Sequence, residues 1–226
     1  MNPTETNKLS IAQLWKYFKI AITGKEQEFT SGSIRRAVFM LSIPMILEMI
    51  MESIFAIVDI FYVSQVSVNA VATIGLTESV ITLVYAVAIG LSMAATAVVA
   101  RRVGEKDLTG ASKAAVQAII LGITVSILVS IIGIVYPKEI LALMGAEPDL
   151  IAEGYGYTQV LLGGNATIML LFLINAIFRG AGDASIAMWT LVLSNGLNII
   201  LDPIFIFGFG PIPAFGVEGA AIATTI

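Results

Sequence analysis

The sequence predicts an all-α membrane protein, and three observations carry that prediction. First, the 226 residues are 58% hydrophobic and 12% charged, with a mean hydropathy of +0.94, whereas soluble domains carry a charge fraction of about 25%. Second, long stretches contain no charge at all. Third, the basic residues gather at alternate ends of these stretches. Helices are the expected spanning element, because lipid cannot satisfy exposed backbone groups and the stretches are too long for barrel strands.

Three charge-free runs are each longer than the ~20 residues that a helix needs to cross a ~30 Å hydrocarbon core. Shorter runs before and after them complete the pattern of a six-helix bundle. The apolar sequence stops at Ile226 with no basic residue after it, so we expect the sixth helix to be truncated. The expected helices cover about 37–63, 71–100, 114–136, 154–178, 184–207 and 217–226.

Eleven of the twelve Lys and Arg residues fall on one side of this arrangement, and Lys138 alone falls on the other. The positive-inside rule therefore places the N-terminus and the even-numbered helix exits in the cytoplasm. We expect the membrane to be the plasma membrane. Residues 1–33 form a cytoplasmic N-terminal extension, and 34–226 form the transmembrane lobe. In the extension, residues 9–22 have helical spacing around Trp15. They predict a helix in the membrane interface, or else a segment that packs on its own bundle or is disordered.

Composition excludes several functions. The chain has no Cys and no His, which excludes disulfides, a thiolate nucleophile, and metal sites built from thiolate or imidazole. Basic clusters that would bind nucleic acid are also missing. The loops are too short for a catalytic domain outside the membrane, so we expect no enzyme and no cofactor.

The first span carries three acidic residues, Glu48, Glu52 and Asp59, on roughly one helical face. A carboxylate at membrane depth costs at least ~2.5 kcal/mol, so this face should look into the bundle or into a wet cavity. Glu48 lies near the cytoplasmic end and favours a structural role, whereas the sequence does not decide the role of Glu52. Pro44, early in the same span, removes a helical hydrogen bond and permits a bend.

The fifth span places Asn198 and Asp202 one turn apart, with Pro203 directly after them. Pro203 leaves the carbonyl of Ile199 without its helical donor. Carboxylate, amide and backbone oxygens are ligands for hard cations, and unwound helices near mid-membrane are where transporters place them. Alternatively, two carboxylates close together in a low dielectric can share a proton. A purely structural interpretation, in which the polar groups hold helices together, is the competing one.

Asn175 in the fourth span and Glu78 in the second are weaker polar signals. Glu78 follows Thr77 and is consistent with a helix cap near the outer surface.

Six segments together resemble multidrug and toxic compound extrusion (MATE) transporters. They are SIRRAVFMLSIPMILEMI, FAIVDIFYVS, ARRVGEKD, NAIFRGAGDA, NIILDPIFIFGFG and GVEGAAIATTI, in the right order from about residue 34 to the end. The resemblance implies a fold of twelve helices in two lobes around a cleft, of which this chain is most of the N-terminal lobe. It also implies a monomer that exports amphipathic or cationic compounds in exchange for Na⁺ or H⁺, with membrane lipid and the C-terminal lobe of the same chain as its neighbours.

The resemblance places the coupling site on Asp59, Asn198, Asp202 and Thr224, with Asn175 alongside and Na⁺ as the ion these four residues could hold. Thr224 rests on the resemblance alone. Glu52 is a further candidate, and Pro44 and Pro203 are candidate hinges. Two departures are that Ser64-Gln65 stands where the family commonly has a glycine, and that Glu48 and Glu52 are not general family features.

We therefore predict a secondary active antiporter. A lipid-linked precursor flippase of the same superfamily is the alternative, but its cavity needs cationic residues, and the five predicted spans contain no Lys or Arg. An intramembrane aspartyl enzyme and a passive channel or scaffold are the rivals from other classes. The enzyme would need a glycine-flanked aspartate motif that is missing around Asp59 and Asp202.

Overall fold

The computed structural model describes residues 11–23 and 34–226 of the chain, and these residues are nearly all helical. The only bridge between extended segments in this part of the chain joins Phe209 to Ile212. The helices are α1 (Ile11–Thr23), α2 (Ile34–Val63), α3 (Val68–Gly104), α4 (Leu108–Val135), α5 (Pro137–Leu143), α6 (Pro148–Gly163), α7 (Asn165–Gly180), α8 (Ala184–Phe207) and α9 (Val217–Thr225).

Five of the expected spans are confirmed as helices long and apolar enough to cross a membrane, and α9 stands in the place of the sixth. Several helices begin earlier than the apolar runs do, because a polar side chain caps their first turn. The Ser67 hydroxyl accepts a hydrogen bond from the Ala70 amide at 2.9 Å, and an Asp107 carboxyl oxygen accepts one from the Gly110 amide at 2.8 Å. The helices therefore include charged residues that the apolar pattern left in loops.

The fourth span is two helices rather than the single one expected, because α6 ends at Gly163 and α7 begins at Asn165. The Asn165 side-chain amide donates to the Leu162 carbonyl, to the Ser126 carbonyl and to the Ser130 hydroxyl, and its oxygen accepts from the Ser126 hydroxyl. Gly164 lies at the break, where a Cβ would come within 2.5 Å of the Thr225 side chain. The break is therefore held together by α4 and tightly covered by α9.

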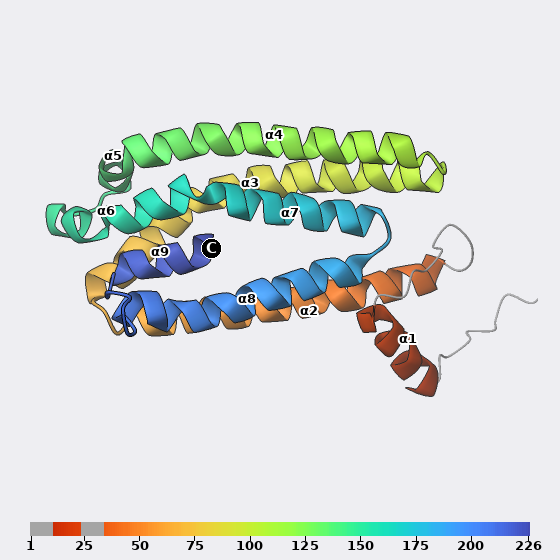
Figure 1. Ribbon diagram of the computed structural model, residues 1–226, viewed down its shortest axis with the longest axis horizontal. Coiled ribbons are helices and arrows are strands. Elements are labelled where there is room, and N and C mark those ends of the chain that lie inside the picture. The colour runs from red at the N-terminus through yellow and green to blue at the C-terminus, as the bar shows by residue number, and fades with distance from the viewer. Residues whose placement is uncertain (1–10, 24–33) are drawn as a thin grey trace, which may run out of the picture.

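Toward the end where α3 joins α4, the helices form two layers, whereas at the opposite end α3 begins at the level of α2 and α8 and crosses obliquely to α4 (Figure 1). In one layer α2 packs against α8, and in the other α3 packs against α4 and α7. Helix α9 lies between the layers at one end and contacts both α6 and α8. Helices α2 and α3 are consecutive, yet they contact each other only weakly. The short helix α5 was not expected from the sequence; Pro137 starts it at a position where a missing backbone donor costs nothing.

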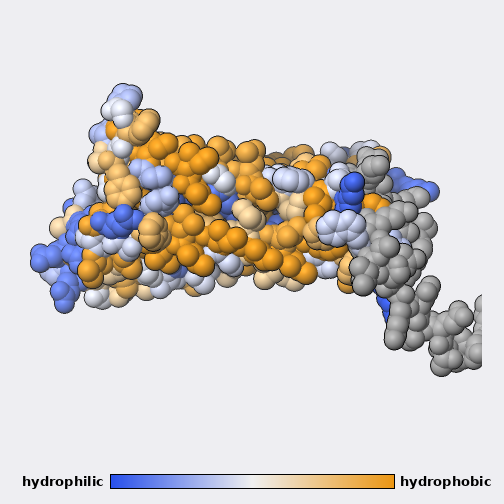
Figure 2. Space-filling view, turned by 90° about the horizontal axis from the view of Figure 1, so that it is seen from below, coloured by the Kyte–Doolittle hydropathy of each residue, from blue (hydrophilic) through white to orange (hydrophobic). Residues whose placement is uncertain are grey.

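The outer surface has the character of a membrane protein. Figure 2 shows one face as a mainly hydrophobic band between hydrophilic ends. Large aliphatic side chains on α2 and α4 are exposed, among them Ile57, Ile120 and Leu128. The helix ends at Arg35, Arg101 and Arg179 lie together at the end of the lobe opposite α5 (Figure 1). The described basic residues thus gather as the sequence predicted, with Lys138 on α5 at the opposite end of the lobe.

Helix α1 confirms the helical spacing in the N-terminal extension; residues 9 and 10 of the expected segment lie outside the described residues. Helix α1 contacts both α2 and α8, and the Trp189 indole donates to the Ile22 carbonyl at 3.0 Å. Trp15 stacks on Phe18 and remains 68% exposed. The segment therefore packs on its own bundle, and its place in the membrane interface stays a prediction.

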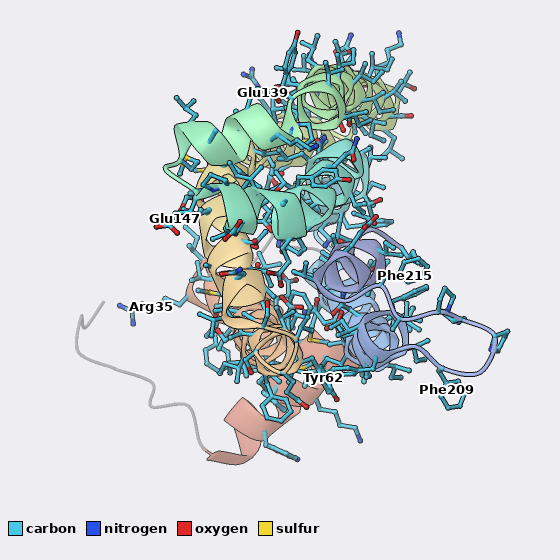
Figure 3. All side chains as sticks on the ribbon, turned by 90° about the vertical axis from the view of Figure 1, so that its left-hand side faces the viewer. Arg35, Tyr62, Glu139, Glu147, Phe209 and Phe215 are labelled. Atoms are coloured by element: carbon cyan, nitrogen blue, oxygen red, sulfur yellow. The ribbon has the colours of Figure 1, made fainter. Side chains whose placement is uncertain are left out.

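The opposite end of the lobe carries the loop between α8 and α9, which projects away from the bundle with Phe209 near its tip (Figure 3). Gly208, Gly210 and Gly216 adopt positive φ angles there, a conformation that glycine reaches without strain. The loop then returns to α8, because the amides of Phe215 and Gly216 donate to the carbonyls of Phe205 and Ile206. This return positions α9 against the part of α8 that carries the candidate site.

Candidate functional site: unpartnered acids between α2, α8 and α9

Helix α8 buries the polar stripe that the sequence predicted. Asp202 is fully buried, Asn198 is 6% exposed and Asn195 is 9% exposed. Both carboxyl oxygens of Asp202 and the amide oxygen of Asn198 are buried and accept no hydrogen bond in the described structure. A buried polar atom without a partner is costly, and native proteins rarely leave several together.

Asp59 on α2 belongs to the same region. Helices α2 and α8 pack against each other, and the carboxylates of Asp59 and Asp202 lie within electrostatic range of one another. One Asp59 oxygen is buried and unpartnered as well. Two acids with unsatisfied oxygens therefore lie within electrostatic range on two packed helices, with no Lys or Arg paired to either among the described residues.

Thr224, which only the family resemblance suggested, joins the site from α9. The Asn198 amide nitrogen donates to the Thr224 hydroxyl at 3.3 Å, and that hydroxyl donates to the Ala220 carbonyl at 3.0 Å. Gly219 allows α9 to come this close, since a Cβ there would lie 2.4 Å from the Phe205 carbonyl oxygen. The hydrogen bond holds the amide so that its unpartnered oxygen is free to accept from, or coordinate, another group.

The structure brings Asn175 near this region less directly. Asn175 is buried on α7, which packs against α8, and its amide oxygen is unpartnered. Within the described residues it shares no hydrogen bond with Asn198 or Asp202.

Tyr157 of α6, which sequence reasoning missed, is a buried neighbour of these acids. It is 3% exposed and lies within electrostatic range of both Asp59 and Asp202. Nothing in the sequence around Tyr157 distinguishes it from an aromatic core residue.

The oxygen atoms present fit a small hard cation. Unpartnered oxygens of Asp59, Asp202 and Asn198 are hard ligands, and the Thr224 hydroxyl lies beside them. A cation or a proton would satisfy the charge that no protein group neutralises. Glu78 of α3 is a further carboxylate within electrostatic range of Asp59, and no group of three or more acidic residues arranged to hold a metal occurs in the described parts of the chain.

The other acids of the first two spans behave differently. Glu48 is buried and accepts a hydrogen bond from the Arg179 guanidinium at 2.8 Å, which agrees with a structural role. Glu52, one turn away, is exposed and lies within electrostatic range of Glu48. The expectation for Glu78 was wrong, because α3 begins at Val68 and Glu78 lies inside the helix rather than at its cap.

Both prolines lie inside continuous helices, Pro44 in α2 and Pro203 in α8, so neither ends its span. Their roles as hinges stay predictions.

The comparisons with known proteins agree with this architecture. The sequence model of the MatE family matches residues 44–204. The chain belongs to the MatE family. Its relatives include a protein named FAD transporter from Shewanella oneidensis, 28% identical over 86% of this chain, and the multidrug export protein MepA from Staphylococcus aureus, 27% identical over 88%. A solved structure of a multidrug resistance MATE family transporter in its outward-facing conformation superposes with a TM-score of 0.80, at 34% identity over 89% of this chain.

The chain spans less than half the length of these relatives, covering 43% of the FAD transporter, 43% of MepA and 45% of the solved transporter. It is therefore a multi-pass membrane lobe of a MATE-type fold, and its relatives are transporters rather than enzymes.

Proposed function

We propose that the full-length protein is a secondary active antiporter of the plasma membrane, which exports lipophilic cationic compounds in exchange for Na⁺ or H⁺. The coupling ion binds at Asp59, Asn198, Asp202 and Thr224, with Asn175 close by. The observation that carries this proposal is the set of buried, unpartnered oxygens on α2 and α8. Buried oxygens that find no partner within the protein are available to bind an exchangeable cation or proton.

The distribution of charge supports the proposed orientation in the membrane and a positively charged substrate. The N-terminus and the exits of α3 and α7 carry the basic residues, which places them in the cytoplasm by the positive-inside rule. The acids at the site have no basic partner, so an ion or substrate of positive charge is favoured there. A membrane ligand shifts a transporter between two states only by binding them with different affinity.

A flippase for lipid-linked anions is less well supported. The expectation that the spans contain no Lys or Arg was wrong, because the helices are longer than the apolar runs. The spans of the structure include Arg101, Arg102, Lys113 and Arg179 near the basic end of the lobe. Arg101 and Arg102 pair with Glu105 in an exposed turn. The Arg179 guanidinium is engaged by Glu48 and is no free cation for a pyrophosphate. The C-terminal half of the protein completes the cleft in the arrangement that we propose.

The test is efflux of a fluorescent lipophilic cation from vesicles that contain the full-length protein, with Na⁺ and pH gradients imposed separately. We expect one of the two gradients to accelerate efflux. Asp59→Asn and Asp202→Asn should each abolish that acceleration. Asp149→Asn, an exposed residue at the start of α6, is the matched control and should retain it. Full ion-driven efflux by both site variants would remove the site assignment.

A further inference from the structure

One ion pair connects parts of the chain far apart in sequence. Arg179, in the last turn of α7, lies 2.8 Å from Glu48 of α2, and their side chains are 22% and 7% exposed. The other ion pairs described for the lobe, between Arg101 or Arg102 and Glu105 or Asp107, lie within one exposed turn. The Glu48–Arg179 pair is therefore the one described salt bridge that acts between helices.

This pair joins the two layers of the lobe. Helix α2 packs with α8, whereas α7 packs with α3 and α4 and, less extensively, with α8, to which a short connection joins it at the basic end. Helices α2 and α7 have no extended packing of their own. At the other end α9 lies between α6 and α8 and bridges the layers by side-chain packing. At the end that carries Arg35 and Arg101, the long-range polar link described between α2 and the α3–α7 layer is the Glu48–Arg179 pair.

The two partners differ in how firmly they are held. Arg179 precedes Gly180, where a Cβ would come within 2.8 Å of the Thr96 carbonyl oxygen, so the end of α7 is pressed onto α3. The Thr96 hydroxyl also donates to the Ala176 carbonyl at 2.9 Å. Glu48 instead lies one turn after Pro44, where the α2 backbone lacks one helical hydrogen bond. Movement at this interface is thus expected of α2 and not of α7.

The chemistry of the pair suits repeated opening. The second carboxyl oxygen of Glu48 is buried and unpartnered, so the pair is incompletely satisfied when closed. Arg179 keeps about a fifth of its side chain exposed and can return to water when the layers part. A fully enclosed and fully satisfied pair would be much harder to separate.

We infer that the Glu48–Arg179 pair is a clamp, which holds α2 against the end of α7 at the basic end of the lobe and must open for the interior to be reached from that side between these two helices. The inference goes beyond the proposed antiport, because it concerns access to the lobe and not the ion or the substrate. It also gives Glu48 a role that its absence from the general family pattern left open.

The test measures access rather than transport. Met51 is half-buried, three residues beyond Glu48 on the same helical face. In the full-length protein with no other cysteine, Met51→Cys is alkylated by a membrane-impermeant reagent applied separately to each face of the membrane. We expect Glu48→Gln and Arg179→Gln each to raise the alkylation rate roughly tenfold from the basic face, because one buried partner is left uncompensated.

A charge exchange separates a clamp from general loosening of the fold. The double variant Glu48→Arg with Arg179→Glu should bring the rate back to within about twofold of the parent. Glu105→Gln, which removes an exposed ion pair at the same end, is the matched control and should leave the rate unchanged. The clamp is refuted if both single variants are alkylated at the parental rate. It is also refuted if the charge-exchange variant is alkylated as fast as the single variants are expected to be. Because alkylation needs no ion or substrate, these outcomes are independent of whether the antiport proposal holds.

Discussion

Glu48 and Asp59 lie on the same helix, close to the same face, and have opposite surroundings. Glu48 has a guanidinium from another layer within 2.8 Å. Asp59 has the carboxylates of Asp202 and Glu78 within electrostatic range and no cation paired to it among the described residues. The charge of Glu48 is neutralised by Arg179 of the protein. The charge of Asp59 can be neutralised only by an ion or proton from the solution. The comparison teaches that an acid within the membrane can be structural or functional, and that its partner decides which.

The largest expected effect on stability comes from removing the cation of the structural pair. Arg179→Gln leaves Glu48 buried without a positive partner, and we expect a loss of about 2 to 3 kcal/mol in the free energy of unfolding. Thermal unfolding of the full-length protein in detergent measures it. The double variant with Glu48→Gln should recover most of the loss, and failure to do so would mean that Glu48 does not depend on Arg179.

The same contrast exists among the buried asparagines. Asn165 makes hydrogen bonds to four protein groups, whereas the side-chain oxygens of Asn175 and Asn198 accept none. Asn165→Ala should therefore destabilise the lobe by about 2 kcal/mol, since it leaves buried groups of α4 and α6 unpaired. Asn175→Ala should cost clearly less in the same thermal assay. Equal losses would show that partnering does not separate the two kinds of amide.

The membrane spans and the buried polar face of α8 could be predicted from the sequence. Charge-free runs gave the spans, and the spacing of Asn198 and Asp202 indicated one buried face on α8. The partner of Glu48 could not be predicted, because Arg179 lies 131 positions away and served in the sequence only as a marker of orientation. The break at Gly164 and the place of Tyr157 were missed for the same physical reason, since each depends on contacts between helices that no local pattern records.

A smaller effect is expected at the edge of the unpartnered site. Thr224→Val keeps the shape of the side chain but removes the hydroxyl that accepts from Asn198. We expect the concentration of coupling ion needed for half-maximal efflux to rise roughly fivefold, about the worth of one hydrogen bond, while stability stays near that of the parent. An unchanged ion requirement would place Thr224 outside the site.

The smallest effect is expected where an ion pair is fully exposed. A hydrogen bond from Arg101 lowers the pKa of the Glu105 carboxyl, yet water screens this pair. Glu105→Gln should leave the melting temperature unchanged at neutral pH. Destabilisation as large as that of Arg179→Gln would show that burial does not distinguish the two ion pairs.

The central claim is that Asp59 and Asp202 together hold an exchangeable small cation. The most direct measurement is the melting temperature of the purified full-length protein as Na⁺ replaces a large organic cation at constant ionic strength, repeated across a range of pH. A ligand that binds only the folded protein raises its stability. We predict that Na⁺ or acid stabilises the parent and that Asp202→Asn loses this response. If Asp202→Asn shows the same stabilisation by Na⁺ and by acid as the parent, Asp59 and Asp202 do not hold the exchangeable cation.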